Sequence, residues 1–140
     1  MFLETEDYKA VCDPDDLDVI IQSDTQSRQR AERTAMEEIS LYLRGRYDIA
    51  KAFAATGEER NFWLIQITVN IVLYYMIHWL PQNMGFDARK QLYDDAIARL
   101  KDVQSGRATP DLPTYTNSQG GTDTANPMRY GSMSPNIYDY

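Results

Sequence analysis

Cysteine and histidine are almost absent from this 140-residue chain, which contains one of each, Cys12 and His78. A single cysteine cannot form a disulfide within the chain, so we expect assembly in a reducing compartment such as the cytoplasm. Phosphate-binding glycine loops, dinucleotide fingerprints and zinc-protease motifs are missing as well. Cys12 and His78 are the one nucleophile–base combination available, and they lie far apart in sequence. The sequence therefore indicates no enzyme, no metal site and no cofactor.

Positive charge is also scarce, with 14 Lys and Arg against 21 Asp and Glu, for a net charge of −7. Residues 1–24 contain eight acids and one lysine. No basic patch is present, which disfavours tight binding along a phosphate backbone. An acidic surface can still lie beside DNA that has to slide past without sticking. The opening "MFLETEDYKAV" has acids where a secretion signal has basic residues, so we expect no secretion.

Long uncharged runs are absent with one exception, residues 62–80, "FWLIQITVNIVLYYMIHWL". At about 1.5 Å per residue this run would span roughly 28 Å, close to the thickness of a bilayer core. Its polar residues recur every four positions, which favours a helix surrounded by protein over a membrane span. We expect a neighbouring subunit to supply part of its cover. The residues assigned to this subunit interface are Gln66, Asn70, Tyr74 and His78, together with Arg44 and Arg46.

Two short helices are predicted near the start of the chain. Thr5 is a candidate N-cap for a helix over residues 6–12. Asp13 followed by proline predicts a second helix over residues 14–21. The acids of "DPDDLD" also invite a calcium interpretation, but the segment lacks the glycine and the distal glutamate of an EF-hand loop. Acids in the first turn of a helix are favoured by its dipole, so capping is the preferred interpretation.

Two longer amphipathic helices are predicted on either side of the uncharged run. The first begins after Asp24 and ends near Gly45, and the second is capped by Asp87 and followed by Gly106. In both, apolar residues recur at spacings of three and four, which predicts one buried stripe on each helix. The first stripe comprises Ala31, Ala35, Met36, Ile39, Tyr42 and Leu43. The second comprises Leu92, Tyr93, Ala96, Ile97, Leu100 and Val103.

After Arg107 the composition changes to glycine, serine, threonine, asparagine and proline, which cannot build a core. We therefore divide the chain into a helical domain, residues 1–113, and an extended C-terminal arm, residues 114–140. The arm carries spaced tyrosine and methionine residues, which interfaces favour, and we expect it to dock on an adjacent subunit or ring. An unattached terminus is the alternative. The proposed anchors are Tyr115, Met128, Tyr130, Met133, Ile137, Tyr138 and Tyr140.

Three stretches together resemble the Mu-like head–tail adaptor (connector) proteins of tailed bacteriophages. They are "FLETEDY" at the start, "EEISLYLRGRYDIA" at 37–50 and "AIARLKDVQSGRATPDLP" at 96–113. The resemblance implies an all-helical subunit of a ring, usually a dodecamer, that lies beneath the portal, extends the DNA channel and docks the tail. It implies no catalytic residues. The chain departs from the pattern in "DIAKAF", where a proline turn is common, and in its long segment after Pro113.

The sequence thus predicts an all-α bundle of two short and three longer helices with an extended arm, assembled as a ring. The expected function is that of a structural virion protein at the head–tail junction, assembled in the host cytoplasm. Its expected partners are further copies of itself, the portal and the next tail or ring protein, and DNA passes without specific binding. The alternatives are another tail-completion or stopper component, a small helical binding or regulatory module, and a membrane-anchored protein.

Overall fold

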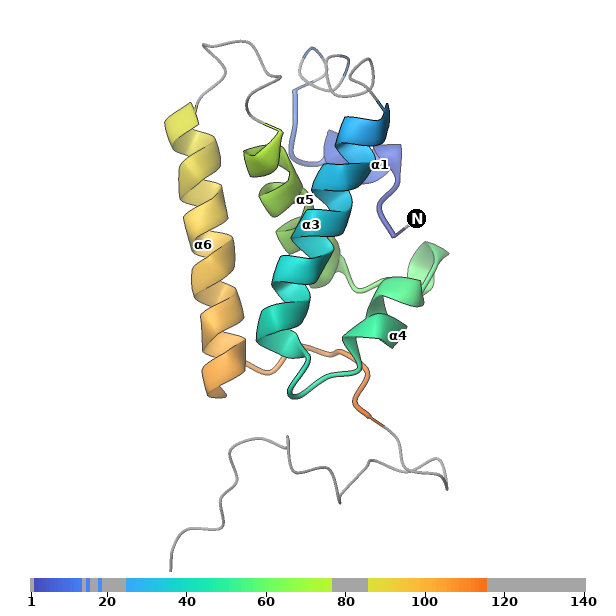
Figure 1. The fold of residues 1–140 in the computed structure, drawn as a ribbon, viewed down its shortest axis with the longest axis vertical. Coiled ribbons are helices and arrows are strands. Elements are labelled where there is room, and N and C mark those ends of the chain that lie inside the picture. The colour runs from blue at the N-terminus through green and yellow to red at the C-terminus, as the bar shows by residue number, and fades with distance from the viewer. Residues whose placement is uncertain (1, 14, 16–17, 19–24, 77–85, 116–140) are drawn as a thin grey trace, which may run out of the picture.

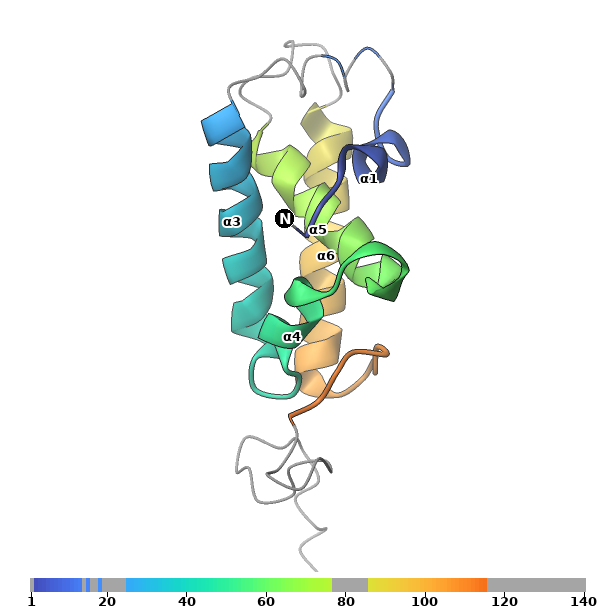
Figure 2. The same cartoon turned by 90° about the vertical axis from the view of Figure 1, so that its right-hand side faces the viewer.

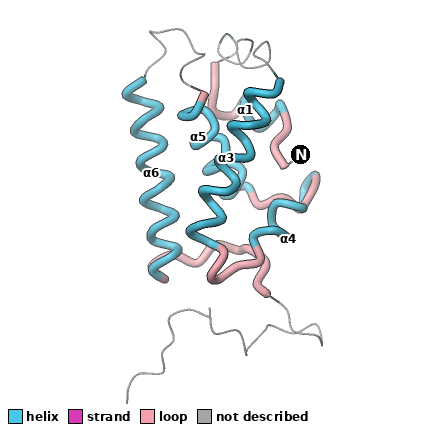
Figure 3. The backbone as a smooth tube through the Cα atoms, viewed as in Figure 1, coloured by secondary structure: helices cyan, strands magenta, loops and turns pink. Residues whose placement is uncertain are grey.

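The computed structural model describes residues 2–13, 15, 18, 25–76 and 86–115, and every regular element among them is helical (Figures 1 and 3). This confirms the all-α class for the described part of the chain. The elements are α1 (Thr5–Lys9), α3 (Thr25–Leu43), α4 (Ile49–Ala54), the 3-10 helix η1 (Gly57–Glu59), α5 (Phe62–Tyr75) and α6 (Phe86–Ser105).

Helices α3 and α6 run along the long axis of the molecule, and α5 runs obliquely in the opposite direction between them, so that the three form a bundle (Figures 1 and 2). Each of the three contacts the other two, α1 packs on α5, and α4 packs on α3. Antiparallel packing of this kind lets the apolar stripes of neighbouring helices meet in one core. The two short helices cover the side of the bundle away from α6 (Figure 1).

Helix α5 is the centre of the core. Leu64, Ile65 and the whole run from Ile67 to Leu73 are buried within a single chain. The prediction that a neighbouring subunit is needed to cover this helix is therefore wrong for its described part, since α1, α3 and α6 supply the cover. The helix also ends earlier than predicted, at Tyr75, and residues 77–80 lie outside the described residues. None of the described helices is long and apolar enough to cross a membrane.

The stripes predicted for α3 and α6 face the core. On α3, Ala31, Ala35, Ile39 and Leu43 are buried, while Met36 and Tyr42 are partly buried against them. On α6, Ala96, Leu100 and Val103 are buried, and Tyr93 and Ile97 pack at their edge. The three-and-four spacing of apolar residues is what places them on one side of each helix.

Several predicted helix ends differ from the structure by one to three residues. Glu4, rather than Thr5, is the N-cap of α1, and α6 begins before Asp87. Helix α3 ends at Leu43, ahead of Gly45. Local capping signals compete within such short windows, so the end of a helix is the least determined part of it.

The helix expected over residues 14–21 lies outside the described residues apart from Asp15 and Asp18, so it stays a prediction. The segment expected to be a weakly helical connector contains a true helix, α4, capped by the Asp48 side chain, which accepts a hydrogen bond from the Lys51 backbone N–H.

Candidate functional site

Residues 107–115, here called the strap, cross the end of the bundle where α6 finishes and α4 begins (Figure 1). The Asp48 backbone N–H donates to the Pro113 carbonyl oxygen at 2.8 Å. The Asn61 side-chain amide donates to the Asp111 carbonyl oxygen at 2.9 Å. The strap thereby joins the loop before α4, the start of α5 and the end of α6.

The strap is also held by side chains at its far end. Leu112 is buried, 6% exposed, in the same core as the helices. Two residues beyond the proposed domain boundary, the Tyr115 hydroxyl donates to the Arg44 carbonyl oxygen at 2.7 Å. Tyr115 is the first of the predicted arm anchors, and the other six lie outside the described residues. These contacts fix where the arm leaves the domain.

The end of α6 explains the position of Arg46. The Arg46 guanidinium donates to the Val103 carbonyl oxygen in the last turn of α6, and this oxygen also accepts from the Gly106 backbone N–H at 3.1 Å. Gly106 follows with φ +88°, as predicted for a residue just past the helix end. A Cβ at Gly106 would lie 3.1 Å from an Arg46 nitrogen, so glycine also leaves room for this contact. Arg46, assigned from the sequence to a subunit interface, is thus engaged inside its own chain.

A groove of about 270 Å³ opens beside the strap, between the start of α5 and the end of α6. Its lining includes an aromatic side chain from α5, three residues of the strap and two opposite charges one turn apart on α6. We call it the strap groove. Its lining residues are Trp63, Arg99, Asp102, Val103, Ala108, Thr109 and Pro110.

Two helices present exposed strips that include large apolar side chains. On α5, Phe62 is 79% exposed, and Gln66, one turn later, is exposed as well. On α3, Leu41 is 70% exposed and lies on the same side as Glu37 and Arg44, which form an ion pair at 3.5 Å. Residues three and four apart share a helix face. We call these the α5 strip and the α3 strip.

The four-residue polar pattern of the uncharged run does not form one surface. Gln66 is exposed, while Asn70 is only 8% exposed and its Oδ1 atom has no hydrogen-bond partner among the described residues. Tyr74 is half-buried, and its ring stacks on that of Tyr93 with centroids 4.1 Å apart. His78 lies outside the described residues.

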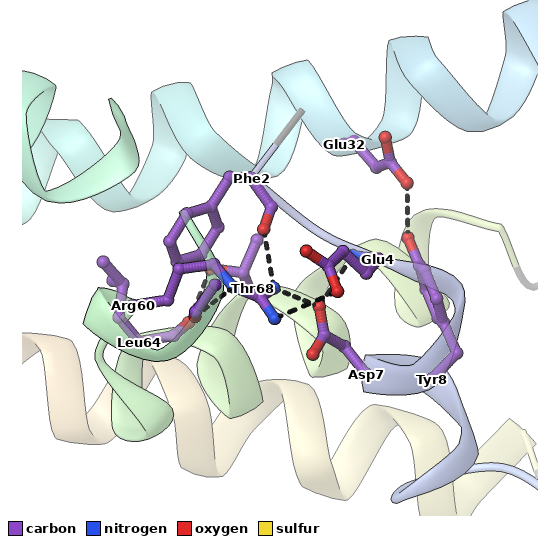
Figure 4. Close-up of polar contacts among 9 residues, drawn as sticks. Phe2, Glu4, Asp7, Tyr8, Glu32, Arg60, Leu64 and Thr68 are labelled. Atoms are coloured by element: carbon purple, nitrogen blue, oxygen red, sulfur yellow. Dashed lines mark hydrogen bonds and ion pairs between the residues drawn. The ribbon is translucent and has the colours of Figure 1, made fainter. Parts of the chain in front are cut away.

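A buried cation holds the N-terminal segment against the start of α5 (Figure 4). The Arg60 side chain is 10% exposed and contacts Asp7 at 2.6 Å and Glu4 at 3.4 Å. It also donates to the carbonyl oxygens of Phe2 at 2.9 Å and Gly57 at 3.1 Å. Two of the N-terminal acids therefore share one cation within the chain, which offsets one of their two negative charges. The sequence signal for this cluster was weak, because 53 residues separate Arg60 from Asp7.

A carboxylate joins the three long helices at a second polar cluster. Glu38 of α3 accepts hydrogen bonds from the hydroxyls of Tyr75 on α5 and Tyr93 on α6, the latter at 2.7 Å. Burial, followed by the hydrogen bond to Glu38, raises the pKa of Tyr75 to about 12. The same causes raise the pKa of Tyr93 well above its usual range. Both phenol hydroxyls therefore stay protonated and donate hydrogen bonds to the Glu38 carboxylate.

A similar pair ties α1 to α3. The Tyr8 hydroxyl donates to the buried Glu32 carboxylate at 2.7 Å (Figure 4). Burial first, and then this hydrogen bond, raises the pKa of Tyr8 well above its usual range. The Arg28 Nε atom lies 3.8 Å from Glu32 and offsets part of its charge. In the described part of the chain, no group of three or more His, Cys, Asp or Glu side chains is placed to hold a metal ion.

Taken together, the described residues form a small helical domain whose polar clusters hold helices together and whose exposed features are strips, a groove and a tethered arm. Such features are typical of proteins that bind other proteins. The chain belongs to the family described as Bacteriophage Mu, Gp36, whose family model matches residues 3–127. It is therefore a bacteriophage protein, of a family that suggests a structural or morphogenesis role. No curated protein and no solved structure matches the chain.

Proposed function

We propose that this chain is the subunit of a head–tail adaptor ring, which docks under the portal, extends the DNA channel and joins the tail machinery. The family match over residues 3–127 is the observation that carries the proposal. It extends over the three stretches that resemble head–tail adaptors, except for Phe2 at the start of the first. The proposed location is the neck of the virion, after assembly in the host cytoplasm.

The fold supports the proposal by bringing two of these stretches together. Residues 37–50 contain the end of α3 and the loop after it, and residues 96–113 contain the end of α6 and most of the strap. They meet through the Arg46 contact with Val103 and the Asp48 contact with Pro113. The resemblance therefore falls on one structural unit, the end of the bundle from which the arm leaves.

The two exposed strips are the proposed ring interface. A ring requires a heterologous contact, in which one face of a subunit meets a different face of the next. The α5 strip supplies Phe62 and the α3 strip supplies Leu41, both large apolar side chains exposed in a single chain. Gln66 and Arg44, predicted from the sequence to contact a neighbour, lie on these strips. Exposed apolar surface of this kind is typical of an interaction site.

The charge of the chain suits passage of DNA through the ring. The net charge is −7, and Arg60 neutralises only part of the N-terminal acid. A channel of this charge repels phosphate and lets DNA slide without specific binding. The arm, fixed at Tyr115, is the proposed link to the next component.

Mass measurement and electron microscopy of the full-length protein test the ring. We expect rings of about twelve times the 16.2 kDa mass of one chain. Phe62→Asp and Leu41→Asp should each reduce ring formation at least tenfold, because a charge would be buried unpaired at the interface. Gln104→Asp, at an exposed α6 position outside both strips, is the matched control. A monomer or dimer at all concentrations would favour a regulatory module and contradict the ring.

A second measurement separates the adaptor from a stopper or tail-completion protein. The adaptor should bind purified portal directly and increase its mass by one full ring. A stopper or tail-completion protein should bind particles only after another ring is in place. Binding to tails without binding to portal would contradict the adaptor role.

A further inference from the structure

The strap groove has the size and chemistry of a site for a few side chains of another polypeptide. Its volume of about 270 Å³ lies below the range typical of small-molecule sites. Trp63 and Pro110 supply flat apolar surface, and the adjacent Arg99 and Asp102 provide one charge of each sign at the rim. Tryptophan in such a site is the residue most often decisive for binding.

One segment of the chain itself has matching chemistry. Residues 126–140, "NPMRYGSMSPNIYDY", combine tyrosine, methionine and proline with only two charged residues, Arg129 and Asp139. Placing Tyr130 against Trp63 would bring the adjacent Arg129 near Asp102, whose contact with the exposed Arg107 is loose, at 3.8 Å. All but two residues of the segment lie beyond the residues that the family model matches.

The point at which the arm leaves the domain indicates whose groove it fills. Pro110 lines the groove at one end of the strap, whereas Tyr115 is fixed to Arg44 at the other end, so the arm leaves away from its own groove (Figure 1). Residues 116–125, "TNSQGGTDTA", have no large apolar side chain. A flexible chain of ten residues has an end-to-end distance of about 17 Å and extends to about 33 Å, so the groove of an adjacent copy is within reach.

We propose that the strap groove binds residues 126–140 of a neighbouring copy of this chain, with Tyr130 packed on Trp63 and Arg129 facing Asp102. The proposal rests on the ring proposed above, because a ring places the groove of one copy within reach of the arm of the next. Each arm then links two subunits through the groove, without further contact between their folded domains.

Cysteine cross-linking between full-length chains tests this docking. In a Cys12→Ala background, Thr109→Cys labels the groove of one copy and Ser132→Cys labels the arm of another. We expect an inter-chain disulfide when the two variants are mixed and oxidised. Gln104→Cys, exposed on α6 outside the groove, replaces Thr109→Cys in the control and should give less than one tenth of the product.

Removing the proposed anchor gives an independent readout. Tyr130→Ala in the arm variant should lower the cross-linking yield more than tenfold, since aromatic anchors dominate such contacts. Asn136→Ala, in the same segment, should leave the yield unchanged. The melting temperature of each variant is measured beside the yield, so that loss of folding is recognised.

Two results would overturn the docking. If both cysteines are placed in one chain and only an intramolecular disulfide forms, the arm fills its own groove. If no disulfide forms in either arrangement, the groove does not bind the arm. Micrographs of the wild-type protein, taken in parallel, keep the two proposals apart: intact rings without cross-links reject the docking alone, and the absence of rings rejects the adaptor proposal.

Discussion

The Arg60 cluster and the Glu38 cluster hold opposite ends of α5 and use opposite chemistry. At the start of the helix a cation that is 10% exposed meets two carboxylates and two backbone carbonyls. Near its end a carboxylate meets two neutral phenols. In the first cluster, the Arg60 cation is stabilised by carboxylates of opposite charge. In the second, the Glu38 carboxylate is stabilised by hydrogen bonds from neutral hydroxyls.

This difference determines how much stability is lost when one side chain is removed from each cluster. Removing Arg60 leaves the largely buried Asp7 carboxylate without its cation and with only the Glu4 backbone N–H as a hydrogen-bond donor, which is destabilising. Removing one phenol from Glu38 leaves the other in place, which costs about as much as one charged hydrogen bond. The N-terminal segment should therefore depend on one side chain, while the contact among the three long helices is shared.

The largest expected effect is that of Arg60→Ala. We expect it to lower the free energy of unfolding by about 2–3 kcal/mol, because the Asp7 side chain is 11% exposed, loses its cation and keeps only the hydrogen bond from the Glu4 backbone N–H. Urea denaturation measures the change. Arg107→Ala is the matched control, since that side chain is 81% exposed and should contribute about 0–1 kcal/mol. Equal effects of the two substitutions would contradict the claim that the Arg60 cluster stabilises the fold more than an exposed ion pair does.

A smaller effect is expected for Tyr93→Phe. Loss of the hydroxyl removes one of the two donors to Glu38 and should lower the free energy of unfolding by about 1–2 kcal/mol. Tyr42→Phe is the control, because the Tyr42 hydroxyl makes no hydrogen bond with the described residues, and it should change stability by less than about 0.5 kcal/mol. A loss above 3 kcal/mol would mean that Glu38 depends on one phenol as Asp7 depends on Arg60.

Alkaline pH should weaken the Glu38 cluster before the folded phenols ionise. In the folded chain, burial and the hydrogen bond to Glu38 raise the pKa of Tyr75 from its ordinary value of 10.0 to about 12. The unfolded chain therefore loses this proton first, so stability is complete below pH 10 and falls as pH rises toward 12. Denaturation between pH 8 and 12 measures the slope, which Tyr75→Phe should reduce. An unchanged slope in that variant would show that ionisation of Tyr75 does not cause the loss of stability at alkaline pH.

The smallest effect is expected for Tyr115→Phe, which leaves both clusters intact. The lost hydrogen bond to the Arg44 carbonyl is exposed and should be worth about 0.5 kcal/mol or less. The strap end should nevertheless open more often, and limited proteolysis next to residue 115 should become faster. Unchanged proteolysis would show that Leu112 and the hydrogen bonds at Asp111 and Pro113 hold the strap without Tyr115.

The periodicity of the sequence was sufficient to predict the three long helices and their buried sides. Ala35, Ile39 and Leu43 are fully buried, and the spacing of three between Met36 and Ile39 offsets the rotation of the four-residue steps, so the apolar stripe stays on one side of the helix. The glycine after α6 was predictable for a similar reason, since Gly106 has the positive φ that a helix end requires. These features depend on neighbours in sequence.

The polar pattern of α5 was not predictable to the same degree. Each step of four residues rotates about 40° around a helix with 3.6 residues per turn, so the pattern turns gradually from one face to another. Gln66 consequently faces outward, while Asn70 is buried and Tyr74 stacks on α6. Which face is covered depends on how three helices pack, and the sequence of one helix does not contain that information.

Contacts between distant segments were missed altogether. The pairing of Arg60 with Asp7, and of Glu38 with Tyr93, joins residues more than 50 positions apart. Spacing patterns report periodicity within one element and carry no signal for such pairs. The strap groove was missed for the same reason, because Trp63 and Pro110 meet only after folding.

Immunogold electron microscopy of phage particles, with antibody raised against this chain, tests the adaptor role most directly. The proposed ring predicts gold at the junction between head and tail, and at no other place on the particle. Gold along the tail tube or over the capsid, or particles without label, would contradict it.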